Sequence, residues 1–320
     1  MTVPISCGYF FDGQNGLIGS GYFGNGGNFI SSDQIKIWRT SNGGNTWIPC
    51  GVPSMEGRVT SIFMKDALVG YASIFSRSDA VWKTTDGGKL WQDITYTNLA
   101  THSCVYATSK SLITTSWSQS NIGSQTSGGF SVDDGFTFSH VFDNDYGEVN
   151  LNGVDFTDDN NGIVSPGPSG DIFNPSPRYT YYTNDGGLTW NRGALLNESW
   201  GIYAVKGSNT FITIPEDNAG ANPKNRNLYY TTNLGITWAQ GSSLPINTQV
   251  TGHIAGKGNI IYVQNYRNSG ATGLFRSDNL GTTWKNVGGP SNERDTRFVV
   301  TGCKGEVVFA FDNAGGIWRT

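Results

Sequence analysis

The chain has 320 residues and a net charge of −4, and only 14% of its side chains are charged, whereas glycine (44 residues) and aromatic residues (13%) are abundant. Length does not decide between one and two domains, because all-β folds of this size occur as single units. The sequence contains no run of like charges and no apolar stretch of about 20 residues, which argues against nucleic-acid binding and membrane insertion. The composition predicts many short strands joined by turns.

In chain order, the same strand–turn–strand pattern begins seven units. Apolar residues alternate on both sides of a short polar turn in each copy, which is typical of a β-hairpin. The seven copies lie at residues 8–23, 60–75, 104–117, 152–167, 200–215, 251–266 and 298–313.

A second pattern, [ST]-x-[DN]-x-G-x-x-[WF], follows six of these hairpins, at residues 40–47, 84–91, 131–138, 183–190, 231–238 and 277–284. A fixed period of this size indicates stacked supersecondary units. The Asp or Asn side chain can accept hydrogen bonds from nearby backbone N–H groups, and the glycine allows a backbone shape that other residues resist. The pattern therefore predicts a tight hairpin whose closing aromatic residue packs between neighbouring sheets.

An aromatic residue stands two positions before most of these motifs, as Trp38, Trp82, Tyr181, Tyr229 and Phe275 do; Gly129 is the exception. Trp318 stands in the same relation to Thr320, the last residue of the sequence. We therefore expect a seventh unit that reaches the first residue of its motif, and either a chain cut from a longer one or closure of the ring by residues 2–5.

The motif closely resembles the Asp-box of the bacterial neuraminidase repeat (BNR), and the unit around it resembles a β-propeller blade. This resemblance, to the superfamily that includes sialidases, xyloglucanases and sortilin-type receptors, covers essentially the whole chain. It implies an all-β fold: one seven-bladed β-propeller domain, residues 1–320, of four-stranded antiparallel blades with Asp-box hairpins, the last blade incomplete or closed by the N-terminus. The expected blades span about residues 5–52, 57–97, 101–143, 148–194, 199–243, 248–289 and 295–320.

The motif residues themselves are expected to be structural. Three copies carry Asn in place of Asp and one carries Phe in place of Trp, whereas a catalytic or metal role would need consistent carboxylates. The residues concerned are Asn42, Trp47, Asp86, Trp91, Asp133, Phe138, Asp185, Trp190, Asn233, Trp238, Asn279 and Trp284.

A ligand site is expected on the opposite face, where long loops join second to third strands. Long loops on a rigid scaffold commonly carry function. Arginine and aromatic side chains near these loops suit sugars or peptides, and the predicted ligand-binding residues are Arg58, Trp117, Tyr146, Trp200, Arg226, Tyr266, Arg267 and Arg297.

Glycoside hydrolysis is the alternative to binding. A sialidase would clamp its substrate carboxylate with arginines, but the Arg-Ile-Pro tripeptide of that family is absent near the first strand. A two-carboxylate glycosidase needs an acid and a base or nucleophile; xyloglucanases build their cleft from two propellers, and this chain holds one. The candidate catalytic carboxylates are Glu148, Glu198, Glu216, Asp217 and Glu293.

We therefore expect a noncatalytic extracellular module that binds carbohydrate or protein on the long-loop face. Photosystem assembly factors are similar in size, but their arginine-rich patch has no counterpart among the scattered arginines here. No cofactor, metal or nucleic acid is expected, and flanking domains of a longer chain remain open. The chain is expected to be secreted, although residues 1–13 lack the layout of a signal peptide. Cys7, Cys50, Cys104 and Cys303 are too widely spaced for a zinc motif, and one disulfide stays open.

Overall fold

The structure is a computed structural model in which every described element is a β-strand. The residues described are 4–21, 34–76, 80–95, 104–115, 128–140, 151–167, 178–197, 199, 201–215, 227–244, 250–265, 274–288, 297–301, 307–311 and 317–319. Within this part of the chain, no helix is long and apolar enough to span a membrane.

Six antiparallel sheets of four strands follow one another in chain order, and we number these blades 1 to 6. Blade 1 contains β1 (Ile5–Phe10), β2 (Gly16–Ser20), β3 (Ile37–Thr40) and β4 (Ile48–Pro49); blade 2 contains β5 (Arg58–Met64), β6 (Gly70–Phe75), β7 (Ala80–Thr84) and β8 (Gln92–Asp93); blade 3 contains β9 (Cys104–Ala107), β10 (Leu112–Thr115), β11 (Gly128–Ser131) and β12 (Ser139–His140). Blade 4 contains β13 (Leu151–Phe156), β14 (Gly162–Pro166), β15 (Tyr179–Thr183) and β16 (Asn191–Leu195); blade 5 contains β17 (Ile202–Ala204), β18 (Phe211–Thr213), β19 (Asn227–Thr231) and β20 (Ala239–Ser243); blade 6 contains β21 (Val250–Lys257), β22 (Ile260–Asn265), β23 (Leu274–Ser277) and β24 (Lys285–Asn286).

The last sheet has three strands, β25 (Arg297–Thr301), β26 (Val307–Phe311) and β27 (Ile317–Arg319), and we call it the C-terminal sheet. The prediction of seven blades, the last incomplete or closed by the N-terminus, is therefore wrong in its number: the described residues form six four-stranded blades. The reason is that, among the described residues, β27 pairs with β26 alone. Ile5 pairs with Ser20 inside blade 1 and so belongs to the inner strand β1, whereas residues 2 and 3 of the expected closure lie outside the described residues.

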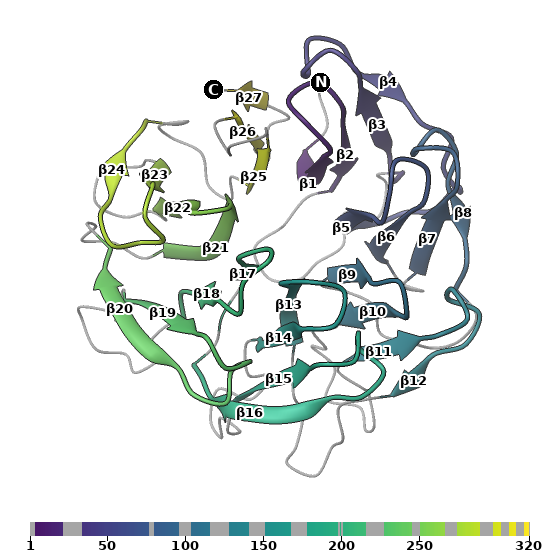
Figure 1. Ribbon diagram of the computed structural model, residues 1–320. Helices are drawn as coiled ribbons and strands as arrows, with labels where there is room; N and C mark the ends of the chain where they lie inside the picture. The colour runs from purple at the N-terminus through teal and green to yellow at the C-terminus, as the bar shows by residue number, and fades with distance from the viewer. Residues whose placement is uncertain are drawn as a thin grey trace, which may run out of the picture.

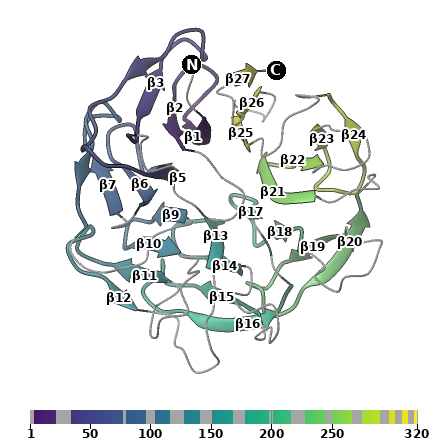
Figure 2. The ribbon, with the colours of Figure 1, turned by 180° about the vertical axis from the view of Figure 1, so that it is seen from behind.

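The sheets form a ring with their first strands at the centre and their fourth strands at the rim (Figures 1 and 2). Because each sheet is an up-and-down meander, the turns between first and second strands and between third and fourth strands share one face, which we call the turn face. The loops between second and third strands, and the connections between sheets, share the other face, the loop face.

Apolar residues on the two faces of each sheet pack against the neighbouring sheets, so the core lies between blades. The layer between blades 1 and 2 contains Leu17, Val59, Trp82 and Trp91, all at most 2% exposed. Burying a side chain of this size contributes about 1.5–3 kcal/mol each. Stacking of neighbouring sheets therefore holds the ring together.

Third and fourth strands pair in one register throughout. In blade 1 Arg39 pairs with Ile48 and Trp38 with Pro49, and the same offset recurs in blades 2 to 6. This constancy follows from the constant length of the motif that joins the two strands. Each turn is a copy of one local structure.

Candidate functional site

The turn motif forms the same hydrogen-bonded structure in all six blades. In blade 1, the Thr40 hydroxyl donates to Asn42 Oδ1 (3.0 Å), which also accepts from the Thr46 amide (2.9 Å), while the Gly44 amide donates to Thr40 Oγ1 (2.9 Å). The same three bonds, with the same residue spacing, occur around Asp86, Asp133, Asp185, Asn233 and Asn279. The motif residues thus hold the turns in place.

The closing aromatic residues of the motif lie where the sheets meet. Trp91 is 2% exposed and donates its indole N–H to the Gly88 carbonyl (3.1 Å), and Trp190 donates to Gly187 in the same way. Trp47 packs against Phe10 edge-to-face, with ring centroids 6.1 Å apart. The remaining closing residues, Phe138, Trp238 and Trp284, pack against apolar clusters between blades.

Hydrogen bonding lowers the pKa of eight described aspartates. Bonds from the Thr137 hydroxyl and amide and from Ser131 lower the pKa of Asp133 to about 2. Every described carboxyl group whose pKa departs from its ordinary value is an aspartate with a lowered pKa: Asp12, Asp66, Asp86, Asp133, Asp134, Asp158, Asp185 and Asp278. A general acid for glycoside hydrolysis needs the opposite shift. These aspartates are therefore unsuited to that role.

The five candidate catalytic carboxylates, Glu148, Glu198, Glu216, Asp217 and Glu293, lie outside the described residues. So do six of the eight predicted ligand-binding residues: Trp117, Tyr146, Trp200, Arg226, Tyr266 and Arg267. Arg58 and Arg297 are described. They begin the inner strands β5 and β25, at the loop-face end of the ring.

The two arginines begin inner strands in different registers. Arg58 pairs with Phe75 and Arg297 with Phe311, the last residue of the second strand in each case. Counted from the equivalent pairs Tyr71–Lys83 and Phe309–Arg319, Phe311 corresponds to Ser73 and not to Phe75. Blade 1 lies between these two sheets, so an arginine begins the inner strand on each side of it.

Packing restricts the Arg58 side chain. Its guanidinium carbon lies 4.5 Å from the centre of the Phe75 ring, which is a cation–π contact. A Cβ atom on Gly21, whose φ is +159°, would lie 2.1 Å from Arg58 Cβ, so the glycine makes room for the arginine. Stacking on an aromatic ring orients the planar guanidinium, which can then bind a carboxylate through two parallel N–H bonds.

A polar cluster at the turn-face end of the inner strands was not predicted from the sequence. The Lys206 ammonium donates to Asp155 Oδ1 (2.6 Å), Tyr106 Oη (3.3 Å) and the Phe156 carbonyl, and the Ala204 amide donates to Asp155 Oδ2 (2.8 Å). Burial raises the pKa of Tyr106 to about 12. Burial alone would lower the pKa of Lys206, but Asp155 raises it above its ordinary value.

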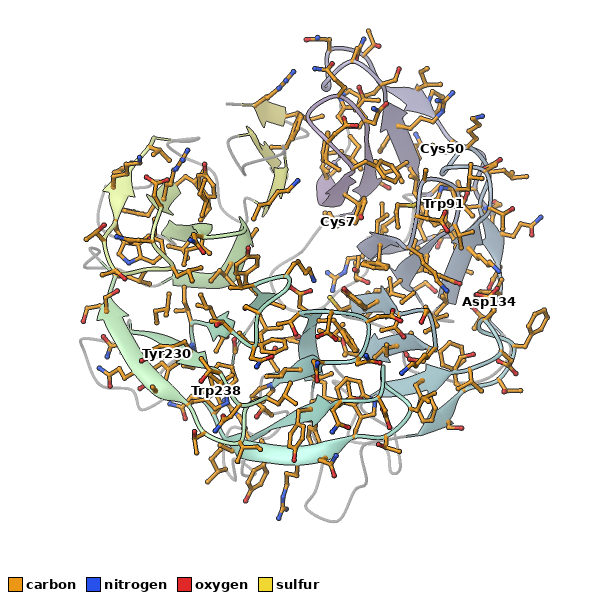
Figure 3. The ribbon with its side chains drawn as sticks, in the orientation of Figure 1. Cys7, Cys50, Trp91, Asp134, Tyr230 and Trp238 are labelled. Atoms are coloured by element: carbon orange, nitrogen blue, oxygen red, sulfur yellow. The ribbon has the colours of Figure 1, made fainter. Side chains whose placement is uncertain are left out.

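This cluster ties together blades 3, 4 and 5. Lys206 makes three hydrogen bonds, which is the full number that an ammonium can donate, so its contacts are structural. The one sequence signal was Asp155, a charged residue inside the apolar strand LNGVDF. Cys7, Cys50 and Cys104 are half-buried, and Cys303 lies outside the described residues. Figure 3 shows Cys7 on the inner strand of blade 1 and Cys50 near the rim.

No arrangement of three or more His, Cys, Asp or Glu side chains that could hold a metal ion occurs among the described residues. The geometry there consists of structural turns, an interblade polar cluster and two arginines at the loop-face end of the ring. It defines an all-β propeller of four-stranded antiparallel blades.

Comparison with known proteins agrees with this class. No protein-family model matches the chain, and no curated protein matches it. Among solved structures, YCF48 bound to a D1 peptide is similar with a TM-score of 0.60 and 16% identity, over 99% of this chain and 93% of that one. YCF48 from Cyanidioschyzon merolae is similar with a TM-score of 0.62 and 13% identity, over 99% and 95%.

An ancestral GH74 enzyme is also similar, with a TM-score of 0.59 and 16% identity, over 84% of this chain but only 39% of that one. YCF48 and the GH74 enzymes are β-propellers. At these identities the likeness concerns the fold alone. The neighbours include a peptide-bound propeller and an enzyme, so they do not decide between a binding and a catalytic function.

Proposed function

We propose that this propeller is a noncatalytic module, acting outside the cytoplasm, that binds an extended protein segment on its loop face. The observation that carries the proposal is that Arg58 and Arg297 are the first residues of the inner strands β5 and β25, on the two sides of blade 1. Arginines at these positions favour a ligand with carboxylates, as acidic side chains or as a chain terminus. The six turns are, in this proposal, Asp-boxes that build the scaffold.

The alternatives are a glycan ligand and glycoside hydrolysis. The lowered pKa of Asp86, Asp133 and Asp185 supports binding over hydrolysis, since a general acid needs a raised pKa. The peptide present in one YCF48 structure supports a protein ligand as the first choice. A glycan would use the same loops, with aromatic side chains against its apolar faces.

Selection from a display library of random dodecapeptides, in parallel with a glycan array, tests the choice of ligand. We expect enriched peptides rich in Asp and Glu, whose binding weakens by at least about tenfold, or 1.4 kcal/mol, in Arg58→Ala and in Arg297→Ala. Arg192→Ala is the matched control, because Arg192 lies on the outer strand β16 and stacks on Tyr179 (4.5 Å); it should leave binding unchanged.

A panel of chromogenic glycosides tests the enzyme alternative directly. We expect no turnover. Turnover that disappears when Glu148, Glu198, Glu216, Asp217 or Glu293 is changed to Gln or Asn would contradict the noncatalytic proposal and favour a hydrolase. Enrichment of glycans on the array, with no peptide enriched, would replace the protein ligand by a carbohydrate.

A further inference from the structure

Two short segments of the chain pair with each other on the loop face, between blades 1 and 2. Gln34 and Glu56 form an antiparallel bridge, and the Ile35 amide donates to the Met55 carbonyl (2.9 Å). Ile35 is 2% exposed, and it lies with the half-buried Met55 in the core layer between these blades. The side chains of Gln34 and Glu56, one position away on each segment, are exposed. Burial of alternate residues therefore anchors the segments whose exposed side chains belong to the loop face.

Gly57 joins Glu56, at the end of this paired segment, to Arg58, the first residue of β5. Its φ is +139°, and a Cβ atom on it would lie 2.3 Å from the Phe75 carbonyl oxygen. Glycine is the residue that allows both this backbone angle and this close approach. Glu56 is held by its bridge to Gln34, and Arg58 by its pairing with Phe75. Because two residues of chain span at most about 7 Å, the two charged residues are fixed within that distance of each other.

The Glu56 carboxylate places a negative charge beside the arginine. In the part of the chain that the structure describes, no ion pair involves Glu56, and none joins it to Lys36, the exposed cation on the neighbouring segment. The Arg58 guanidinium stacks on the Phe75 ring, at 4.5 Å. A ligand carboxylate bound by Arg58 is therefore repelled by Glu56, unless the ligand also brings a cation to that position.

We propose that Glu56 is a specificity-determining residue of the loop face, and that the bound protein segment carries a basic residue two positions from an acidic one. The acidic side chain binds Arg58 and the basic side chain binds Glu56. In an extended segment, residues two positions apart lie on the same side and about 7 Å apart, which matches the separation of the two protein residues. This inference rests on the proposed function, and it adds that carboxylates alone do not satisfy the surface.

The two opposite charges also separate the classes of ligand. A neutral sugar offers no charged group to either residue, and an acidic glycan offers carboxylates but no cation for Glu56. A polypeptide can carry both signs of charge at the required spacing. Complementary charges at fixed positions select a partner and its register, so an extended segment of mixed charge is the ligand that Glu56 and Arg58 fit.

Selection from one library of random dodecapeptides, on the original chain and on Glu56→Gln in parallel, tests the proposal. On the original chain, we expect Lys or Arg two positions from Asp or Glu at least about threefold more often among enriched peptides than on Glu56→Gln. Glu56→Lys should select against a basic residue at that spacing, because like charges repel.

The affinity of one enriched peptide gives a second measurement. Replacing its basic residue by Gln should weaken binding to the original chain at least about threefold, and should leave binding to Glu56→Gln unchanged. The difference should shrink as NaCl is raised, because salt screens exposed charges. Asp93→Asn is the matched control: it removes a carboxylate from the outer strand β8 of the same blade, and it should behave as the original chain does.

The possible failures are distinguishable. Enriched peptides that depend on Arg58 but have no basic residue at that spacing would overturn this inference and leave the proposed function intact. An equal effect of the peptide change on the original chain and on Glu56→Gln would do the same. No enrichment of any peptide, or binding that is unaffected by Arg58→Ala and by Arg297→Ala, would contradict the proposed function and this inference with it.

Discussion

At the scale of single residues, Asp and Asn perform the same task in the turn motif. Asp185 Oδ1 accepts from the Thr183 hydroxyl (2.7 Å) and the Thr189 amide (3.0 Å), and Asn233 Oδ1 accepts the equivalent bonds from Thr231 (2.8 Å) and Thr237 (3.1 Å). The hydrogen-bond geometry of the turn is the same with the neutral Asn side chain as with the charged Asp side chain. The motif residue is therefore an acceptor for the turn and not a reactive carboxylate.

Substitution of Asp185 separates these two roles. Asp185→Asn should leave the free energy of unfolding within about 0.5 kcal/mol of the original, as surface changes that keep their bonds usually do. Asp185→Ala removes the acceptor for both bonds and should cost about 1–2 kcal/mol, as loss of a comparable capping side chain does. Urea unfolding of the two variants measures the difference, and equal losses would show that charge matters more than geometry.

Acid should destabilise the protein through the same aspartates. Burial alone would raise the pKa of Asp86 and Asp185, but hydrogen bonds lower it below the ordinary value of 3.8, and the pKa of Asp133 lies at about 2. A lowered folded-state pKa means that the unfolded chain binds protons first, so this contribution is complete above about pH 4 and is lost as pH falls toward 2.

Tm measured between pH 6 and pH 2 tests this. The triple variant Asp86→Asn, Asp133→Asn, Asp185→Asn should show a smaller fall in Tm over that range than the original chain. An equal fall in Tm in both proteins would show that other titratable groups cause the acid sensitivity.

At the scale of the elements, the glycine of each motif lets the turn approach the preceding sheet. Gly88 has a φ of +82°, and a Cβ atom on it would lie 2.7 Å from Leu17 Cδ2 of blade 1. Gly207, in the turn between β17 and β18, has a similar φ of +74° but nothing within 4 Å of the position of a Cβ. The two positions share backbone strain and differ in packing.

Gly88→Ala and Gly207→Ala therefore form a matched pair. Gly207→Ala should cost about 1–2 kcal/mol, the penalty of the left-handed backbone alone. Gly88→Ala should cost a further 1–3 kcal/mol or so, because the methyl group overpacks the layer between blades 1 and 2. Urea unfolding compares them; similar losses would mean that the turn can move away from Leu17 at little cost.

At the scale of the whole molecule, blade 1 packs against the C-terminal sheet as other blades pack against their neighbours. Phe10 and Phe309 stack with ring centroids 3.7 Å apart, and both are buried. Arg319 reaches the Gly43 carbonyl across the same boundary. The ring of inner strands is therefore continuous from β25 to β1, which holds Arg58 and Arg297 on a closed scaffold.

The sequence predicted the propeller because its period repeats local information: the same turn, the same aromatic position and the same strand alternation. The total of seven blades was an overestimate, because Trp318 indicates a third strand but carries no information on a fourth. The contacts of Lys206 with Asp155 and of Asp134 with Tyr71 were missed. They join different blades and occur once each, so no repeated sequence pattern predicts them. Most predicted ligand-binding residues lie in the long loops between strands, where the sequence has no periodicity to place them.

Amide hydrogen exchange with and without a peptide selected from the library tests most directly whether ligands bind at the loop face of the inner ring. The account predicts slower exchange at the start of β5 and of β25, beside Arg58 and Arg297, and unchanged exchange in the turns at residues 131–138 and 183–190. Protection confined to those turns, with none at β5 and β25, would contradict it.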